Sequence, residues 1–334
     1  MWLQEDDMPL VSVIVPIYNA EKTIARCLAN LVHQSLTDIE ILLVDDASVD
    51  GTLSILEACE REFPEKVRLF RQMKNAGPGV ARNLALKNAR GSWIGFVDAD
   101  DMVDVSMYEK LYKEAVRTDA DIVDAAFYRE AKDLALQQIT PDMAGKLTAE
   151  KKSLLIASGG YTVSKLFRKD LLLSMSDLFR PVYMLEDMDF LIEAVARARS
   201  VASIPEVLYI YKETRDSLSS DPDLMKFYAS HLGAMAGIYD RLKRLADYED
   251  YRMAAEYAMI VMYSEAVESV ARLMPDEAMA VTMIEQAIAL YQATIETDLS
   301  QNPFCMNPDK MDHKMIHNIE ESLKDPRLYF RNFH

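Results

Sequence analysis

The sequence feature that most constrains the fold is an apolar run over residues 93–97, which ends in three carboxylates, Asp98, Asp100 and Asp101. A short apolar run bounded by turn residues is typical of a strand buried on both faces of a sheet. In α/β proteins, ligands bind at the carboxyl ends of such strands. Crowded carboxylates repel one another unless a cation or fixed donors offset their charge, and oxygen ligands suit Mg2+ or Mn2+. An isolated Asp-x-Asp is more often a plain acidic loop, so the interpretation depends on the rest of the chain.

Upstream of this run, strands and helices alternate along the sequence. Apolar runs with β-branched residues over 10–15 and 39–44, and a short run over 67–70, predict strands. Apolar residues recur at helical spacing over 21–34 and over 52–63. This alternating order is the pattern of an α/β fold with a mostly parallel sheet and helices on both faces.

The rest of the chain changes character at about residue 220. We expect a strand over 121–127 and a helix over 185–199, whereas residues 162–170 form a short segment of mixed character. From residue 221 few β-branched runs remain, and amphipathic helices follow one another with methionines on their apolar stripes. We therefore predict a first domain over 1–220 and a C-terminal helical region over 221–334.

The composition excludes several classes of protein. A formal net charge of −17 argues against nucleic acid as a partner, because tracking a phosphate backbone requires clustered Lys and Arg. The three cysteines are too few and too far apart for a disulfide framework or a zinc site, which suits a reducing compartment. Neither a signal peptide nor a run of about 18 apolar residues is visible, so we expect a cytoplasmic protein without a transmembrane segment.

Two further motifs have competing explanations. Residues 46–51, together with Glu57, nearly match an EF-hand calcium loop, but residues 39–44 predict a strand where an EF-hand requires a helix. A strand-to-helix turn whose acidic side chains face a ligand is the better interpretation. Residues 75–83 are glycine-rich but lack the Lys-Ser/Thr pair of a phosphate-binding P-loop, so the glycines alone indicate only a turn.

Taken together, these segments resemble the family 2 glycosyltransferases. The motifs that carry the resemblance lie at residues 11–19, 43–52, 77–83 and 96–101, in the order and spacing typical of that family. The resemblance implies a GT-A-like fold with a Rossmann-like nucleotide-binding half. It also implies inverting transfer from a nucleotide-diphosphate sugar, with a UDP-sugar favoured, to an acceptor hydroxyl, with Mn2+ or Mg2+ as cofactor. The nucleotide-sugar half would span residues 10–101 and the acceptor half residues 102–220 of a catalytic domain.

The family's functional positions carry over residue by residue. The resemblance implies that Asp187 is the general base and that Asp100 is the main metal ligand, with Asp98 toward the metal or the ribose. Lys165 and Glu186 match the acceptor-side motifs. The positions implied to contact the nucleotide-sugar are Pro16, Tyr18, Asn19, Asp46, Arg82, Asp98 and Arg215.

The chain departs from the family in two places. Leu185 stands where many members have glycine before the Glu-Asp pair, so we expect a differently shaped acceptor pocket. Tryptophan occurs only at positions 2 and 93, so the late Gln-x-x-Arg-Trp motif of processive synthases is missing, and we expect a non-processive enzyme. By analogy the acceptor is a glycan or a lipid-linked molecule of cell-surface polysaccharide or glycoconjugate synthesis. The helical region could cover the acceptor site, form a homodimer, or touch the inner face of the membrane peripherally.

Two other functions fit part of the pattern. A nucleotidyltransferase on a related fold would need a basic triphosphate loop near the first strand, and Glu21-Lys22 is a poor candidate for one. A non-catalytic nucleotide-sugar-binding or scaffold protein would not need a base such as Asp187. A transferase is therefore the favoured prediction, and these two functions are the alternatives.

Overall fold

The computed structural model describes residues 8–175, 178–212 and 223–334. The chain folds into two compact units, a sheet unit and a helical unit, which share the sequence in alternating stretches. The chain enters the helical unit for the last time after Ser217, but two earlier stretches within residues 1–220 also belong to that unit. The sheet unit comprises Met1–Leu147, Gly160–Pro181 and Arg197–Ser217, and the helical unit comprises Thr148–Gly159, Val182–Ala196 and Leu218–His334.

Within the described part of the sheet unit, ten strands form one mixed sheet in the order β3-β2-β1-β4-β9-β6-β10-β5, with β7 paired to β6 and β8 to β10. Strands β1 to β4 are mutually parallel, as the alternating pattern predicts. The strands are β1 (Val11–Ile17), β2 (Ile39–Asp45), β3 (Val67–Arg71), β4 (Trp93–Phe96), β5 (Met102–Val103), β6 (Ile122–Arg129), β7 (Leu134–Leu136), β8 (Gly145–Lys146), β9 (Lys165–Arg168) and β10 (Ser200–Tyr211).

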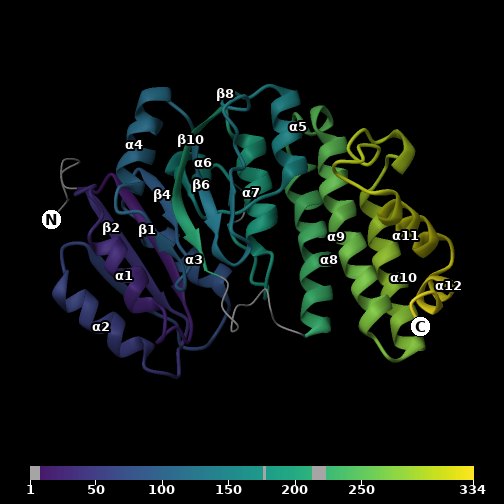
Figure 1. Cartoon of the computed structure of the whole chain (residues 1–334), viewed down its shortest axis with the longest axis horizontal. Coiled ribbons are helices and arrows are strands. Elements are labelled where there is room, and N and C mark those ends of the chain that lie inside the picture. Colours follow the sequence, from purple (N-terminus) through teal and green to yellow (C-terminus); the bar gives the residue numbers. More distant parts are fainter. Residues whose placement is uncertain (1–7, 176–177, 213–222) are drawn as a thin grey trace. The chain divides into compact units, whose positions relative to one another are not determined.

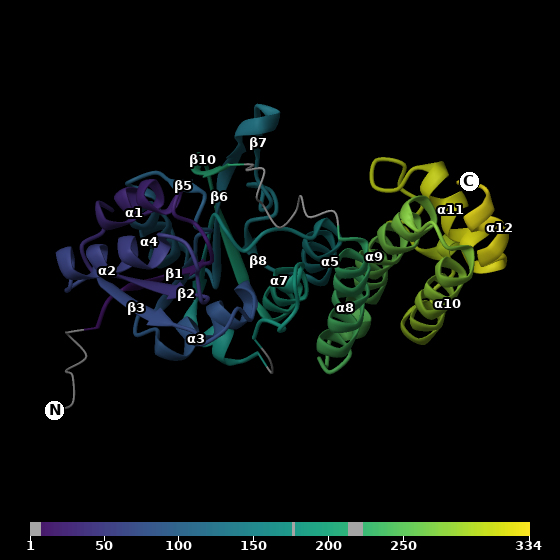
Figure 2. The same ribbon diagram turned by 90° about the horizontal axis from the view of Figure 1, so that it is seen from below.

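Helices cover both faces of this sheet. Every residue of β1 and β2 is buried, as expected for continuous apolar strands in the middle of a sheet. Figure 2 shows α1 and α4 on one face of these strands and α3 on the other. The side chains of Val11, Val13 and Val15 share one core with the apolar stripe of α1. The helices of the sheet unit are α1 (Ile24–Val32), α2 (Thr52–Glu62), α3 (Pro78–Asn88), α4 (Met107–Thr118) and α6 (Lys169–Leu173).

Strand β9 lies in the middle of the sheet, although residues 162–170 gave no clear strand pattern. It pairs antiparallel with β4 on one side and with β6 on the other. The strand begins with Lys165, a charged residue that local reasoning places on a surface. Its ammonium group is instead buried against Asp124 of β6, at 2.9 Å from the carboxylate oxygen Oδ1. The charge is offset by a residue 41 positions away, so the sequence pattern alone could not reveal the strand.

The helical unit is built from antiparallel helices with apolar seams. Figure 1 shows α8, α9 and α10 running side by side. Met235, Met259 and Met283 are buried in these seams, which confirms that they are core residues. Among the described helices, none has the length and apolar composition needed to cross a membrane. The helices are α5 (Ala149–Ser158), α7 (Glu186–Arg197), α8 (Leu224–Leu242), α9 (Arg252–Leu273), α10 (Glu277–Thr294), α11 (His313–Lys324) and α12 (Pro326–Arg331).

Candidate active site

The candidate site lies where the strand order of the sheet reverses. The chain passes from β1 to β2 and β3 on one side, whereas β4 pairs with β1 on the other side. The loops that follow Ile17 and Phe96 therefore meet at the carboxyl edge of the sheet, where open α/β sheets bind ligands. Pro16 is buried within β1, and Tyr18, just beyond the strand, is 47% exposed.

The loops after β1 and β2 are braced against each other. Asn19 Oδ1 accepts a hydrogen bond from the Val49 N–H at 2.9 Å, and the Asn19 N–H donates to Ser48 Oγ at 2.9 Å. Thr52 Oγ1 accepts from the Ala20 N–H at 2.7 Å. These bonds cross between two segments about 30 residues apart in sequence, so they fix the shape of the edge before any ligand binds.

Asp50, an acidic residue of the apparent calcium motif, helps to hold these loops together. Asp50 accepts from the Thr52 N–H at 3.0 Å through Oδ1 and from the Glu21 N–H at 3.2 Å through Oδ2. Slight burial raises the pKa of Asp50, but these hydrogen bonds outweigh it and hold the pKa below the ordinary value. Since β2 is a strand, the preference for a strand-to-helix turn over an EF-hand is confirmed.

Asp46, one of the positions implied to contact the nucleotide-sugar, is 2% exposed and holds the turn before α3. Its Oδ1 accepts from Gln72 Nε2 at 2.8 Å and from the Ala76 N–H at 2.9 Å, and its Oδ2 accepts from the Gly77 N–H at 2.8 Å. Gly77 has a φ of +88°, which glycine adopts without strain. Burial raises the pKa of Asp46 and outweighs the two backbone hydrogen bonds, which lower it. A carboxylate has about four acceptor positions, so one remains for a ligand N–H.

Arg82, from α3, fixes the first aspartate of the Asp-x-Asp motif. Its guanidinium NH2 donates to Asp98 Oδ1 at 2.9 Å, and its Cζ lies 5.3 Å from the ring centroid of Phe179. The Arg82 side chain is 6% exposed, whereas that of Asp98 is 36% exposed. Both side chains therefore lie at one edge of the sheet, where they form an ion pair.

Asp101 is the buried support of the acidic loop. Its Oδ2 accepts from the Tyr209 hydroxyl at 2.5 Å and its Oδ1 accepts from the Lys212 N–H at 2.7 Å. The same hydroxyl accepts from the Asp98 N–H at 3.2 Å. Burial, followed by the charges of Asp98 and Asp100, raises the pKa of Asp101 to about 8. Sequence reasoning noticed Asp101 but assigned it no role, and nothing local pointed to Tyr209, which is 108 residues away.

The acidic loop fits a divalent cation that the ligand helps to coordinate. Among the described residues, no three His, Cys, Asp or Glu side chains gather as a complete metal cage. Mg2+ and similar ions are usually held by one or two carboxylates plus substrate phosphates, so a partial set is what such a site requires. Burial, followed by the charges of Asp98 and Asp100, raises the pKa of Asp101. A cation would relieve the repulsion among these carboxylates.

The residues predicted for the acceptor side fall in different units. Lys165 belongs to the sheet unit and is 2% exposed, with its ammonium group bound to Asp124 and Gln138. Glu186 and Asp187 form the first turn of α7 in the helical unit, where Glu186 is buried and Asp187 half-buried. Arg215 lies outside the described residues. The roles of these four residues remain predictions.

Leu185 has a φ of +60°, immediately before the Glu-Asp pair. This is the left-handed region, which glycine enters freely and a leucine enters at a cost of about 1–2 kcal/mol. The conformation explains why glycine suits this position. The departure from the family pattern therefore changes the side chain, while the backbone keeps a shape that favours glycine.

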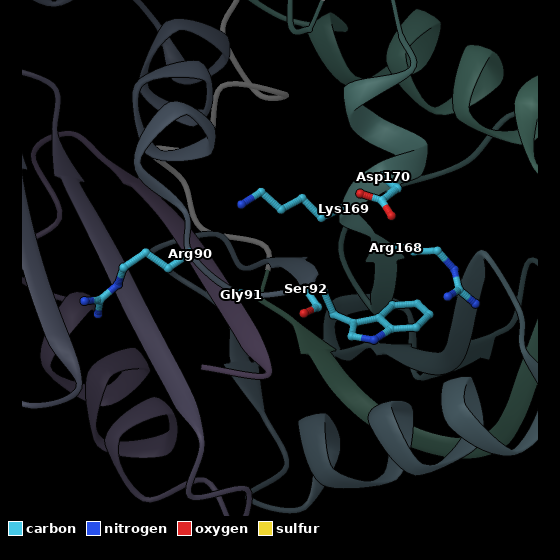
Figure 3. A pocket seen from close by; sticks show the side chains of 7 residues that line it. Arg90, Gly91, Ser92, Arg168, Lys169 and Asp170 are labelled. Atoms are coloured by element: carbon cyan, nitrogen blue, oxygen red, sulfur yellow. The ribbon is translucent and has the colours of Figure 1, made fainter. Parts of the chain in front are cut away.

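A pocket of about 240 Å³ lies at the opposite edge of the sheet (Figure 3). It is lined at the start of β4 and the end of β9, and its cations are already engaged. Arg90 Nε contacts Glu40 at 2.9 Å, Lys169 Nζ donates to the Ala89 carbonyl at 2.8 Å, and Arg168 pairs with Asp119 at 2.6 Å. In Figure 3 the guanidinium groups of Arg90 and Arg168 point in opposite directions. The pocket is therefore distinct from the candidate site.

The family model for glycosyl transferase family 2 matches residues 12–173. This part of the chain is therefore similar to family 2 glycosyltransferases. The uncharacterized glycosyltransferase EpsJ of Bacillus subtilis is 36% identical to it over 226 residues, which is 64% of this chain and 64% of the relative. The matched part of this chain thus spans slightly less than two thirds of that relative's length.

Solved structures of glycosyltransferases share the fold. Staphylococcus aureus TarS 1–349, in complex with UDP-GlcNAc, superimposes with a TM-score of 0.69 at 22% identity and covers 94% of this chain and 91% of that chain. The mannosyltransferase PcManGT from Pyrobaculum calidifontis, in complex with GDP-Man and Mn2+, gives a TM-score of 0.53 at 19% identity, covering 86% of this chain and 82% of that chain. The predicted GT-A-like α/β fold with a C-terminal helical region is thereby confirmed.

Proposed function

We propose that this chain is an inverting, non-processive glycosyltransferase that moves a sugar from a UDP-sugar to an acceptor hydroxyl. The observation that carries the proposal is the carboxyl edge of the sheet, where Asp46 and the Arg82–Asp98 pair are held in place by fixed hydrogen bonds. Support comes from TarS, whose structure with UDP-GlcNAc has the same fold. Within this proposal residues 10–101 bind the nucleotide-sugar, residues 102–220 complete the catalytic domain, and the helical region follows from residue 221.

The nucleotide would bind against the braced loops after β1 and β2. Asp46 has one acceptor position left, which suits the ring N–H of uracil. Pro16, Tyr18 and Asn19 would line the base pocket, and Tyr18 is exposed enough to stack on a ligand. Arg82 would contact the nucleotide, and Arg215 would bind the diphosphate by charge-assisted hydrogen bonds.

The diphosphate would be held with a divalent ion, Mn2+ or Mg2+. Asp100 would be its main ligand, and Asp98 would contribute the oxygen Oδ2, since Arg82 bonds to Oδ1. The bound ion supplies Lewis-acid stabilisation of the charge that grows on the leaving diphosphate. The complex of PcManGT with GDP-Man and Mn2+ supports a metal-dependent site on this fold.

Asp187 would act as the general base. Its carboxylate would take the proton of the acceptor hydroxyl as the oxygen attacks the anomeric carbon, a contribution of roughly 10^2- to 10^4-fold. The bond from the anomeric carbon to the diphosphate breaks in the same displacement, which inverts the configuration. Glu186 and Lys165 would serve the acceptor side, Lys165 through its buried contacts with Asp124 and Gln138.

The acceptor would be a glycan or lipid-linked molecule of surface polysaccharide or glycoconjugate synthesis. TarS is named as a poly(ribitol-phosphate) N-acetylglucosaminyltransferase, which supports a polymer of this general class. Non-processive transfer is proposed because the late Gln-x-x-Arg-Trp motif is missing from the sequence.

The donor site is tested by calorimetric titration of UDP with and without Mn2+. We expect Asp100→Ala to weaken Mn2+-dependent UDP binding at least 10-fold, because the main ligand is removed. The matched control is Asp104→Asn, which changes a nearby carboxylate whose Oδ1 accepts from Ser106 in a local turn. UDP binding that does not depend on the metal, or no UDP binding at all, would contradict the proposal.

The base is tested by Asp187→Asn. An amide cannot accept the proton, so we expect sugar transfer and donor hydrolysis to fall by at least about 100-fold while UDP affinity stays within about twofold. Release of UDP from UDP-glucose, UDP-galactose and UDP-N-acetylglucosamine measures the rate. A wild-type protein that binds UDP but forms no UDP from any of these UDP-sugars would favour the non-catalytic alternative.

A further inference from the structure

Helix α7, which carries Asp187, is held by a buried group of three charges inside the helical unit. Arg241 of α8 donates from Nε to Asp189 Oδ2 at 2.6 Å and from NH1 to Glu193 Oε2 at 2.6 Å. Asp189 and Glu193 are 0% exposed, and Arg241 is 3% exposed. One arginine on α8 thus holds two carboxylates on α7.

The two carboxylates lie on the helix face directed away from the first-turn residue Asp187. Positions four apart share a helix face, so Asp189 and Glu193 point the same way. Asp187 is two positions before Asp189, and residues two apart point to nearly opposite sides of a helix. A forked contact with both carboxylates resists rotation of α7 about its axis, and such a rotation would redirect Asp187.

A second contact holds the far end of the same helix. Lys152 of α5 donates from Nζ to the Ala196 carbonyl in the last turn of α7, and also to Asp247 Oδ2 at 2.9 Å. The C-terminal end of α7 is therefore tied to α5, while Arg241 ties its middle to α8. Together these contacts leave little freedom for the helix to turn or slide.

Stability alone is a weak explanation for such a buried group. Removing charges from water is costly, and buried ion pairs or triads can often be replaced by apolar residues without loss of stability. What an arginine gives, and an apolar residue cannot, is a rigid fork that fixes two carboxylates in direction as well as distance. The arrangement suits a requirement for orientation.

We propose that Arg241 is a positioning residue, which fixes the rotation of α7 through Asp189 and Glu193 and thereby sets the direction of the Asp187 carboxylate. The inference rests on the proposed function, because it assigns a task to the base named there. It also gives the C-terminal helices a part in the reaction, since α8 supplies the arginine.

Arg241→Lys is the test, because lysine keeps the charge but lacks the fork. We expect kcat for UDP release, measured with the fastest of the three UDP-sugars, to fall about 10- to 100-fold while KM and UDP affinity stay within about twofold. The plateau of kcat against pH should fall without movement of its acid limb. Hydrogen exchange in the first turn of α7 should become faster, a readout that does not depend on activity.

The matched control is Arg252→Lys. Arg252 on α9 also pairs with a fully buried carboxylate, Glu256 Oε1 at 2.9 Å, but touches no residue of α7 in the contacts described. We expect this variant to keep kcat within about twofold. Equal losses of kcat in the two variants, or a shifted acid limb with an unchanged plateau, would overturn the positioning role.

A variant with Arg241→Gln, Asp189→Asn and Glu193→Gln covers the case in which Arg241→Lys fails to fold. Its neutral amides can hydrogen-bond to one another without buried charge, and we expect a folded protein with lowered kcat. Wild-type kcat in this variant would overturn the inference. Asp187→Asn distinguishes the role of Asp187 as general base from the positioning role of Arg241. If this variant retains transfer, both proposals are contradicted. If it loses transfer while the Arg241 variants retain theirs, only the positioning role falls.

Discussion

Tyr209 connects the two ends of the acidic loop through a single hydroxyl group. That hydroxyl donates to Asp101 and accepts from the Asp98 N–H, so one oxygen fixes both the buried support and the backbone of the Asp-x-Asp motif. The tyrosine is 0% exposed, and burial followed by the charge of Asp101 raises its pKa. It therefore stays protonated and can keep donating.

Tyr209→Phe should loosen this loop. The buried Asp101 loses a donor, so we expect the free energy of unfolding to fall by about 1–3 kcal/mol. Mn2+-dependent UDP affinity should fall as well, because the backbone at Asp98 loses its partner. Urea unfolding and UDP calorimetry measure the two effects.

Tyr263→Phe is the control for that experiment. Tyr263 also exchanges a buried hydrogen bond, with Ser322 at 2.9 Å, but within the helical unit. It should lower stability without weakening UDP binding. If Tyr209→Phe binds UDP and Mn2+ as the wild type does, the Tyr209 hydroxyl does not support ligand binding by the acidic loop.

At this scale, the sequence could predict the position of residues that belong to a local motif. Asp46 and Asp98 could be placed at one sheet edge because each lies just beyond the end of a strand, and Arg82 could be placed nearby because it lies near the start of a helix. Asp101 and Tyr209 could not be paired, because their contact joins positions 108 apart. A hydroxyl on an apolar strand looks like any core tyrosine until its partner is known.

At the scale of elements, β1, β2 and β3 are linked on one face by a buried carboxylate, Glu40. Glu40 is 1% exposed, and it accepts from Ser12 Oγ at 2.6 Å, from the Arg90 N–H at 2.6 Å and from Arg68 NH1 at 3.0 Å. Burial alone would raise the pKa of Glu40, but these donors outweigh it and hold the pKa below its ordinary value of 4.5.

This linkage predicts a loss of stability in acid. Because the folded pKa of Glu40 is lower than the unfolded one, its contribution is complete above the ordinary value of 4.5 and disappears as the pH falls through the lowered folded pKa. Glu40→Gln should cost about 1–3 kcal/mol at pH 7 and progressively less toward pH 3.

Urea unfolding from pH 7 to pH 3 measures that difference. The control is Glu57→Gln, which changes an exposed carboxylate 3.9 Å from Arg71 and should have little effect at any pH. A difference between wild type and Glu40→Gln that stays constant across this pH range would show that ionisation of Glu40 does not stabilise the sheet.

A strand or helix could be predicted when the residues that cause it to form lie within its own segment of the sequence. Strands β1, β2 and β4 are continuous apolar runs, and such runs identify buried parallel strands. Strand β9 was not predicted because the charge of Lys165 is offset by Asp124, which lies on another strand. The positive φ of Leu185 could not be predicted for a related reason, because the surrounding structure imposes a conformation that leucine does not favour.

At the scale of the whole molecule, the two units are interleaved in sequence. Helices α5 and α7 precede the last passage at Ser217, yet they cluster with the helices that follow it. α5 packs on α9, and Asp189 and Glu193 of α7 pair with Arg241 of α8. A cut at residue 217 therefore removes the partners of two helices that stay behind.

A chain that ends at Ser217 should fold poorly for this reason. It leaves the apolar face of α5 uncovered and two buried carboxylates without Arg241, and the second loss alone is typically worth about 3–5 kcal/mol. We expect aggregation or a broad, weakly cooperative melt by calorimetry. A chain shortened only at Lys324, which removes α12, should melt cooperatively at a somewhat lower temperature. A sharp, wild-type-like transition in the 1–217 chain would show that α5 and α7 need no help from α8 and α9.

The same interleaving affects how the protein is made on the ribosome. Arg241 is translated 48 residues after Glu193, a delay of roughly 2–10 s at 5–20 residues per second. During that time the carboxylates of α7 stay hydrated, because no cation has yet emerged to accompany them into the interior. Protease resistance of α7 in stalled nascent chains should accordingly appear only after Arg241 has left the exit tunnel. The orientation of Asp187 can thus be fixed only after most of the polypeptide has been synthesised.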